Sequence, residues 1–176
     1  MLTVQWNLGD IMNEKFLMTD TVIFDAKPDA VPYKYRISYK MGQFCMILAI
    51  CSDGSSCSFL KIQMISNALN DKEAETKLLD FCNDNNLFFA SAIRFDPAVN
   101  RVLGYAVADG MVKQLVKGTY KLTDKGKEFV KKIKSDKDLM IKEIKFLEKV
   151  KNKLSEDKIS ELMDMWRYAD VGNRKT

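Results

Sequence analysis

Histidine is absent from this 176-residue sequence. It is the usual general base of enzymes near neutral pH and the commonest metal ligand. No Gly-x-x-x-x-Gly-Lys loop for nucleotide phosphates is present, and Ser55, Ser56 and Ser58 have no histidine to activate them. We therefore expect no catalytic residues and no enzymatic activity.

Cysteine is scarce, with four residues and no Cys-x-x-Cys pair. Cys45 and Cys82 fall on apolar faces of predicted helices, which favours buried free thiols over metal ligands. Free thiols are typical of the cytoplasm, and the N-terminus has no basic region followed by an apolar one. The expected location is therefore cytoplasmic, with no metal ion and no cofactor.

Long hydrophobic runs are also missing. The longest, residues 44–51, is far shorter than the roughly 20 residues of a membrane helix. The 47% hydrophobic content is ordinary for a globular protein, and the length suits one domain with extensions. The net charge of +4 is uneven: residues 1–110 hold 10 Lys/Arg against 13 Asp/Glu, and residues 111–176 hold 18 against 11. The second part is therefore strongly basic.

The most informative stretch that is present covers residues 96–134, which have the pattern helix, hairpin, helix. Asp96 is predicted to cap a helix that Pro97 opens and Gly110 ends. Short strands are expected over 111–116 and 119–122, joined by a Lys117-Gly118 turn that needs a positive φ. This order is the sequence outline of a winged-helix domain, a class that binds nucleic acid or proteins.

The helix after the hairpin should begin at Thr123, with Phe129, Val130 and Ile133 on one face. Upstream, a helix is predicted over 36–50 and a second over 58–69, capped by Ser58. Asn70 and Glu73 form a capping-box signature for a third helix, which ends near residue 84. The aromatic segment 87–95 is predicted to be a strand at the edge of the hairpin. The apolar residues at helical spacing in the first helix are Ile37, Met41, Phe44, Cys45 and Leu48.

The C-terminal region is predicted to hold two helices. The first, from 136 to about 154, begins at a capping box of Ser135 and Asp138, and the second begins at Ser155 and leads to a polar tail over 171–176. Their apolar stripe packs either on the same chain or on a helix of another chain. Methionine and tryptophan are enriched at protein interfaces. The partner-contact candidates in this region are Met140, Leu147, Met163 and Trp166.

Residues 1–35 lack helical periodicity and are interpreted as an N-terminal arm. Its large apolar residues either pack on the core or anchor a partner; they are Trp6, Phe16, Leu17 and Phe24. The predicted organisation is an arm over 1–35, a winged helix-turn-helix core over 36–134, and C-terminal helices with a polar tail over 135–176. The fold class is mainly α, with a small β component (α+β).

Base-specific DNA reading has weak support in the sequence. The third predicted helix, 71–84, holds more acids than lysines, and the helix 97–109 offers only Asn100 and Arg101 as suitable groups. The hairpin is different, because a lysine cluster there either contacts phosphates without reading sequence or forms a solvated basic face. The phosphate-contact candidates are Lys113, Lys117, Lys121 and Lys125.

Two segments together resemble a known family. They are ISYKMGQFCMILAICSDGSSCSFLKIQMISNAL (37–69) and FDPAVNRVLGYAVADGMVKQLVKGTYKLTDKGKEF (95–129). The chain resembles the small middle component of bacterial three-component ABC systems, the group that includes Lamassu-type anti-phage defence. The resemblance covers residues 36–134, and residues 1–35 match nothing.

The resemblance implies a non-catalytic accessory subunit. Such a subunit would bridge an SMC-like ABC ATPase and an effector, often a nuclease, encoded in the same operon. It implies an anti-phage or anti-plasmid defence complex, DNA association through that complex and no membrane contact. The alternative from the sequence is a winged-helix transcriptional regulator that binds DNA itself.

Overall fold

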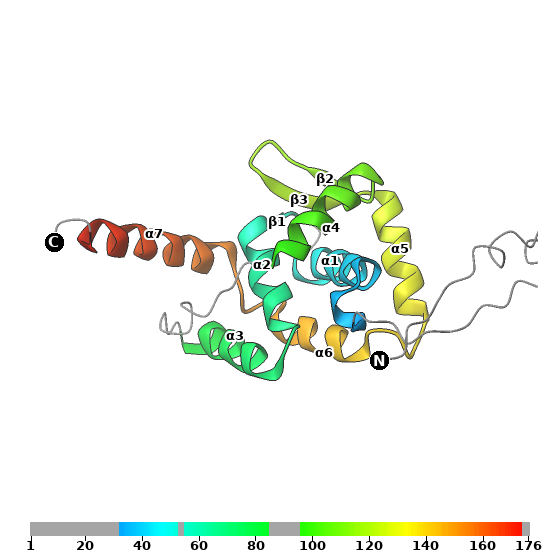
Figure 1. Ribbon diagram of the computed structural model, residues 1–176, viewed down its shortest axis with the longest axis horizontal. Coiled ribbons are helices and arrows are strands. Elements are labelled where there is room, and N and C mark those ends of the chain that lie inside the picture. Colours follow the sequence, from blue (N-terminus) through cyan, green and yellow to red (C-terminus); the bar gives the residue numbers. More distant parts are fainter. Residues whose placement is uncertain (1–31, 53–54, 85–95, 174–176) are drawn as a thin grey trace, which may run out of the picture. The chain divides into compact units, whose positions relative to one another are not determined.

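Helix α1 (Ile37–Cys51) lies at the centre of the fold in the computed structural model, and most of the other helices pack against it, whereas the C-terminal helix extends away (Figure 1). The structure describes residues 32–52, 55–84 and 96–173, which belong to one unit, Val31–Thr176. Of the predicted arm, only residues 32–35 are described, and they include the short 3-10 helix η3 (Tyr33–Tyr35). Trp6, Phe16, Leu17 and Phe24 lie outside the described residues.

Burial of α1 extends around the whole helix rather than along one face. Every residue from 40 to 48 is buried, including the polar side chains of Lys40 and Gln43. The sequence analysis assigned one apolar stripe, and the structure corrects this, because α4, α5, α6 and α2 surround the helix. A helix that is apolar nearly all round is typical of a core position. Ile37, predicted on the buried face, is 36% exposed because it belongs to the first turn.

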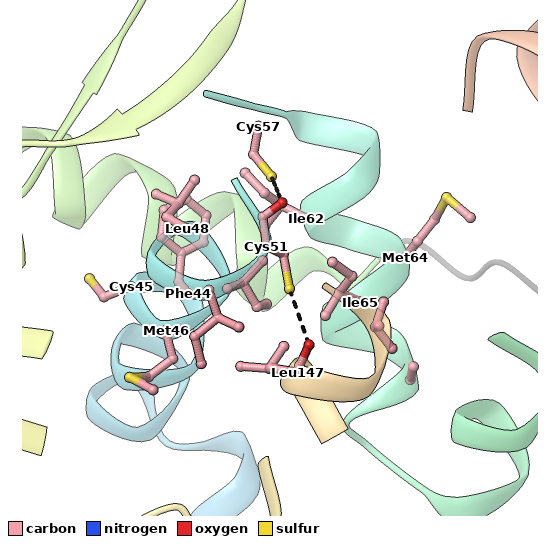
Figure 2. Packing of buried hydrophobic residues seen from close by; sticks show 14 of the residues in the cluster. Phe44, Cys45, Met46, Leu48, Cys51, Cys57, Ile62, Met64, Ile65 and Leu147 are labelled. Carbon is pink, nitrogen blue, oxygen red and sulfur yellow. Dashed lines mark hydrogen bonds between the residues drawn. The ribbon is translucent and has the colours of Figure 1, made fainter. Parts of the chain in front are cut away.

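The core around the end of α1 is shown in Figure 2. Cys51 is the last residue of α1, and its Sγ donates to the backbone oxygen of Leu147 at 3.8 Å. Cys57 Sγ donates in turn to the oxygen of Cys51 at 4.0 Å. Leu147 is fully buried here, so it belongs to the chain's own core.

Helices α2 (Phe59–Ala68) and α3 (Lys72–Asp84) follow α1, and α3 packs on α2. Ser58 caps α2 as predicted, because its side chain accepts from the N–H of Lys61. The predicted cap of α3 was wrong by one residue: Asp71 Oδ1 accepts from the N–H of Ala74 at 2.8 Å. Asn70 is used elsewhere, since its Oδ1 accepts from Lys40 Nζ at 2.8 Å.

A small antiparallel sheet has the strand order β1-β3-β2. Strands β2 (Val112–Gln114) and β3 (Thr119–Leu122) form the predicted hairpin. Strand β1 (Cys57–Ser58) pairs with the other edge of β3, a role that the sequence analysis assigned to segment 87–95. Residues 87–95 themselves lie outside the described part of the chain. The fold is mainly α with this small sheet, as the sequence predicts.

Helices α4 (Pro97–Ala108) and α5 (Asp124–Ser135) flank the hairpin along the chain. The predicted caps are confirmed: Asp96 accepts from the N–H of Ala98, and Thr123 accepts from that of Gly126. Gly110 and Gly118 have φ values of +66° and +73°, as their predicted roles require. These local features fix where α4 ends before the hairpin and where α5 begins after it.

The C-terminal helices are α6 (Ile141–Val150) and α7 (Glu156–Asn173). The predicted start at residue 136 was wrong, because Asp136 Oδ1 accepts from the N–H of Asp138 in a turn, and α6 begins only after Met140 at φ 55°. Ser155 caps α7 as predicted, by accepting from the N–H of Lys158. Helix α7 extends to residue 173, into the predicted tail. None of the described helices is long and apolar enough to cross a membrane.

Candidate nucleic-acid and partner interface

The β2–β3 hairpin carries the predicted lysine cluster. Val112 pairs with Leu122 on the buried face of the hairpin, so the next pair, Lys113 and Lys121, lies on the opposite face. Gly118 N–H donates to the oxygen of Leu115 at 2.9 Å, and Leu115 N–H donates to Thr119 at 2.8 Å. This is the pattern of a three-residue hairpin loop closed by a left-handed glycine. The register therefore brings two lysine side chains directly opposite each other.

The four predicted lysines differ in their surroundings. Lys113 and Lys117 are exposed, and Lys121 is half-buried. Lys125 Nζ donates to the backbone oxygen of Asp109 at 2.6 Å, so this side chain satisfies a carbonyl at the end of α4. The expectation that all four side chains lie in solvent is therefore wrong only for Lys121, which is half-buried, while Lys125 is exposed but bonded to a carbonyl. Among the described residues, no carboxylate forms an ion pair with Lys113, Lys117 or Lys121.

Helix α4 is the helix that leads into the hairpin, and it contacts β2. Segment 71–84 was the first predicted candidate for a DNA-reading helix, but this segment, α3, packs on α2 and lies away from the hairpin (Figure 1). On α4, Asn100 and Arg101 are exposed as predicted, and Asn100 Oδ1 accepts from Gln63 Nε2 at 3.4 Å. Towards the hairpin, the exposed residues of α4 are apolar or aromatic.

Tyr105 and Val107 are 53% and 42% exposed near the C-terminal end of α4. Val116, in the hairpin loop, is fully exposed. A Cβ added to Gly104 would meet nothing within 4 Å, so no other part of the described chain covers this exposed position in α4. We call the exposed residues Arg101, Gly104, Tyr105 and Ala108, which recur at three- and four-residue spacing along one side of the helix, the α4 face. Sequence reasoning missed its apolar character because it counted only groups that read bases.

A buried polar network holds the start of α4 against α1. Lys40 Nζ lies 3.0 Å from Asp96 Oδ2, with side-chain exposures of 1% and 16%. Gln63 Oε1 accepts from the N–H of Asp96 at 3.0 Å, which connects α2 to the same point. From the sequence, Asp96 had only a predicted capping role and Lys40 had none. A lysine inside the long apolar helix was the available signal, since buried lysines are almost always paired.

The four predicted partner residues of the C-terminal region separate into two groups. Met140 is 7% exposed and Leu147 is fully buried, so both serve the chain's own core. Met140 Sδ would lie 3.1 Å from a Cβ built on Gly42 of α1, which shows how closely the segment before α6 packs. Met163 and Trp166 on α7 are partly exposed, with Trp166 packed against the core. For Met140 and Leu147, the structure favours the intramolecular alternative.

The cysteines are all free and buried. Burial raises the pKa of the Cys45 thiol to about 12, so this group stays protonated at neutral pH. A protonated, buried thiol is neither a nucleophile nor a metal ligand. Within the ranges that the structure describes, no three His, Cys, Asp or Glu side chains are grouped as a metal site would need.

Comparison of the chain with protein-family models, with curated proteins and with solved structures finds no match.

Proposed function

We propose that this chain is a non-catalytic subunit that binds protein partners through a winged-helix framework. The observation that carries the proposal is the composition of the α4 face. A helix that reads bases needs Arg, Lys, Asn or Gln on its exposed side. Here the half of α4 nearest the hairpin presents Tyr105 and Ala108 on this face instead, next to Gly104, which has no side chain. Aromatic residues are enriched in the centres of protein interfaces.

The winged-helix interpretation is supported by the topology. The chain order is α1, β1, α2, then α4 directly before the β2–β3 hairpin, and β1 pairs with β3. In this interpretation, α3 is an extra helix, inserted between α2 and α4 of the winged-helix framework. Helix α4 then occupies the position of a recognition helix and the hairpin is the wing.

The resemblance of residues 37–69 and 95–129 to the small component of three-component ABC systems supports a finer assignment. The chain would bridge an SMC-like ABC ATPase and an effector, such as a nuclease, in a bacterial anti-phage or anti-plasmid defence complex in the cytoplasm. The α4 face would contact one of these two partners, and the complex as a whole would associate with DNA.

Co-purification tests this proposal. The gene would be expressed in its native operon with an affinity tag on this chain, and the wild type should retain the ATPase and the effector. The double variant Tyr105→Glu/Ala108→Glu should lose one of them, because two carboxylates on the same face would be desolvated in the contact. Leu139→Glu/Ile141→Glu is the matched control, since these residues are 41% and 40% exposed but lie on either side of Met140, where α6 begins. A wild-type chain that elutes alone would overturn the proposal.

The second candidate is a DNA-binding transcriptional regulator, favoured by the three hairpin lysines that have no carboxylate partner among the described residues. Such a protein would protect a specific sequence upstream of its own gene without any partner. A footprint obtained with the isolated chain would support this candidate over the accessory subunit.

A further inference from the structure

A pocket lies at the base of the hairpin, between the end of α1, strand β3 and the start of α5. Its volume is about 240 Å³. The apolar part of its lining comes from all three elements: Leu48 and Ala49 of α1, Leu122 of β3 and Val130 of α5. Ser52, Ser55, Lys121 and Lys127 complete the lining. The pocket is therefore apolar with a polar and basic border.

Among the described residues that line the pocket, two are lysines and none is an acid, so these residues give the border a positive charge. Lys127 Nζ lies 2.8 Å from Asp124 Oδ1, on a carboxylate that is itself highly exposed. Lys121 has no such partner among the described residues, and its cross-strand neighbour is the like-charged Lys113. Like charges directly opposite on a sheet are unfavourable. Asp124 offsets part of the charge of Lys113, and an anionic group at the border would do the same for Lys121.

The volume of the pocket limits the size of the group that can bind in it. Pockets for drug-sized molecules span roughly 300–1,000 Å³, and an apolar cavity of about 150 Å³ holds a benzene molecule. A volume of about 240 Å³ thus fits a single large side chain. Interfaces often insert one such anchor into a pocket surrounded by polar contacts.

We propose that this pocket binds one aromatic side chain of a partner protein, within a short segment whose flanking residues are Asp or Glu. The aromatic ring would contact Leu48, Leu122 and Val130, and the flanking carboxylates would pair with Lys121 and Lys127. The inference rests on the proposed function, in that it gives the protein-binding subunit a second docking site besides the α4 face.

Synthetic peptides test the site directly on the full-length chain. The probe is acetyl-Glu-Asp-Phe-Asp-Glu-amide, titrated while ¹H–¹⁵N chemical shifts are recorded. The expected result is saturable shifts of the pocket residues. A peptide with Ala in place of Phe should bind at least about fivefold more weakly, because it lacks the buried ring, and a Lys-flanked peptide should not bind. Equal binding of the Ala peptide would overturn the proposal, because it would leave only charge attraction.

Two variants and one control distinguish binding in the pocket from non-specific attraction between charges. Ala49→Met places a longer side chain in the pocket and should abolish binding of the Phe peptide without changing charge. Lys121→Glu should weaken it at least about fivefold, whereas Lys117→Glu, an exposed change in the hairpin loop, should leave it nearly unchanged. Equal loss in the two lysine variants would overturn the proposal.

Failure of this inference is distinguishable from failure of the proposed function. If the operon partners co-purify but the Phe peptide does not bind, the pocket assignment is wrong and the accessory-subunit proposal stands. If the peptide binds in an Ala49-dependent manner but no partner co-purifies, the pocket assignment stands and the accessory-subunit proposal fails.

Discussion

Among the described glycines, Gly126 has the least room for a side chain. A Cβ at this position would lie 2.2 Å from the backbone oxygen of Met111 and 2.8 Å from Leu122 Cδ2. The same Met111 oxygen accepts from the N–H of Thr123 at 2.9 Å. The first turn of α5 is therefore seated directly on the backbone at the start of the hairpin, and only glycine leaves room for this approach.

Gly126→Ala should lower the free energy of unfolding by about 2–3 kcal/mol, because the added methyl group forces α5 away from backbone atoms. Urea unfolding followed by circular dichroism measures the change. Gly104→Ala is the matched control, since a Cβ there meets nothing within 4 Å. It should stabilise the chain by about 0.5–1 kcal/mol, through helix propensity alone. A neutral Gly126→Ala would show that α5 does not depend on this contact.

The Cys45 thiol makes stability depend on pH in the alkaline range. Its pKa is raised from 9.0 to about 12 by burial, so the unfolded chain releases this proton at lower pH than the folded chain. The stabilising contribution is complete below pH 9 and is lost as the pH rises towards 12. In that window the thiol contributes a slope of up to about 1.4 kcal/mol per pH unit. Urea unfolding in steps across the window should show a shallower decline for Cys45→Ala than for the wild type. Parallel curves would contradict this prediction.

At the scale of elements, the Lys40–Asp96 pair connects three helices. Lys40 belongs to α1, Asp96 caps α4, and Gln63 of α2 binds the backbone N–H of Asp96. Lys40 Nζ also donates to Asn70 in the connection between α2 and α3. The orientation of α4, and with it the α4 face, depends on this network. The pair is asymmetric, because the lysine side chain is 1% exposed and the aspartate 16%.

This asymmetry predicts unequal effects of removing the two charges. Asp96→Asn keeps a capping side chain but leaves the buried ammonium without its counter-ion, and should cost about 2–3 kcal/mol of unfolding free energy. Lys40→Met removes the buried charge and retains most of the volume, while Asp96 keeps its cap bond to Ala98 and some contact with water. It should cost about 1 kcal/mol. Denaturant midpoints at unchanged m-value measure both. A larger loss for Lys40→Met would contradict the assignment.

Across the whole molecule, positive charge is concentrated in the part of the sequence that begins with the hairpin. Residues 111–176 hold 18 Lys/Arg against 11 Asp/Glu, whereas the preceding 110 residues have an excess of acids. The hairpin and the exposed lysines of α5 belong to this basic part, and the acidic α3 packs on α2. A surface of this kind binds phosphates non-specifically when it binds nucleic acid.

If the chain contacts DNA, Lys113, Lys117 and Lys121 should supply the phosphate contacts, since Lys125 is engaged by a backbone carbonyl. Three contacts predict a log–log salt slope of about −2.7 for duplex DNA. The triple Glu variant should lose this binding, measured by fluorescence anisotropy at several salt concentrations.

A matched triple Glu variant of α6 should retain most of the affinity, because Lys142, Lys145 and Lys149 are exposed outside the hairpin. Equal losses in the two variants would assign the effect to net charge. If the hairpin variant instead fails to join its protein partners while DNA binding by the complex is unchanged, the hairpin is a protein interface.

Local interactions were predictable from the sequence by itself. The caps at Ser58, Asp96, Thr123 and Ser155, and the glycine at 118, involve groups within a few residues of each other. Their geometry therefore depends on few distant contacts, and the helix–hairpin–helix order followed from them. The lysine positions on the hairpin were also predictable, because strand alternation fixes which side chains share a face.

Only the tertiary structure decided the features that depend on distant partners. Strand β1 is two residues long, too short for any periodicity, and exists because β3 offers it a free edge. Asp71 caps α3 because Lys40 occupies the side chain of the preceding Asn70. The burial of α1 on all sides and the pocket beside Lys121 arise from helices far apart in the sequence. Short-range hydrogen bonds are encoded in a few adjacent residues, whereas packing depends on which surfaces the whole chain brings together.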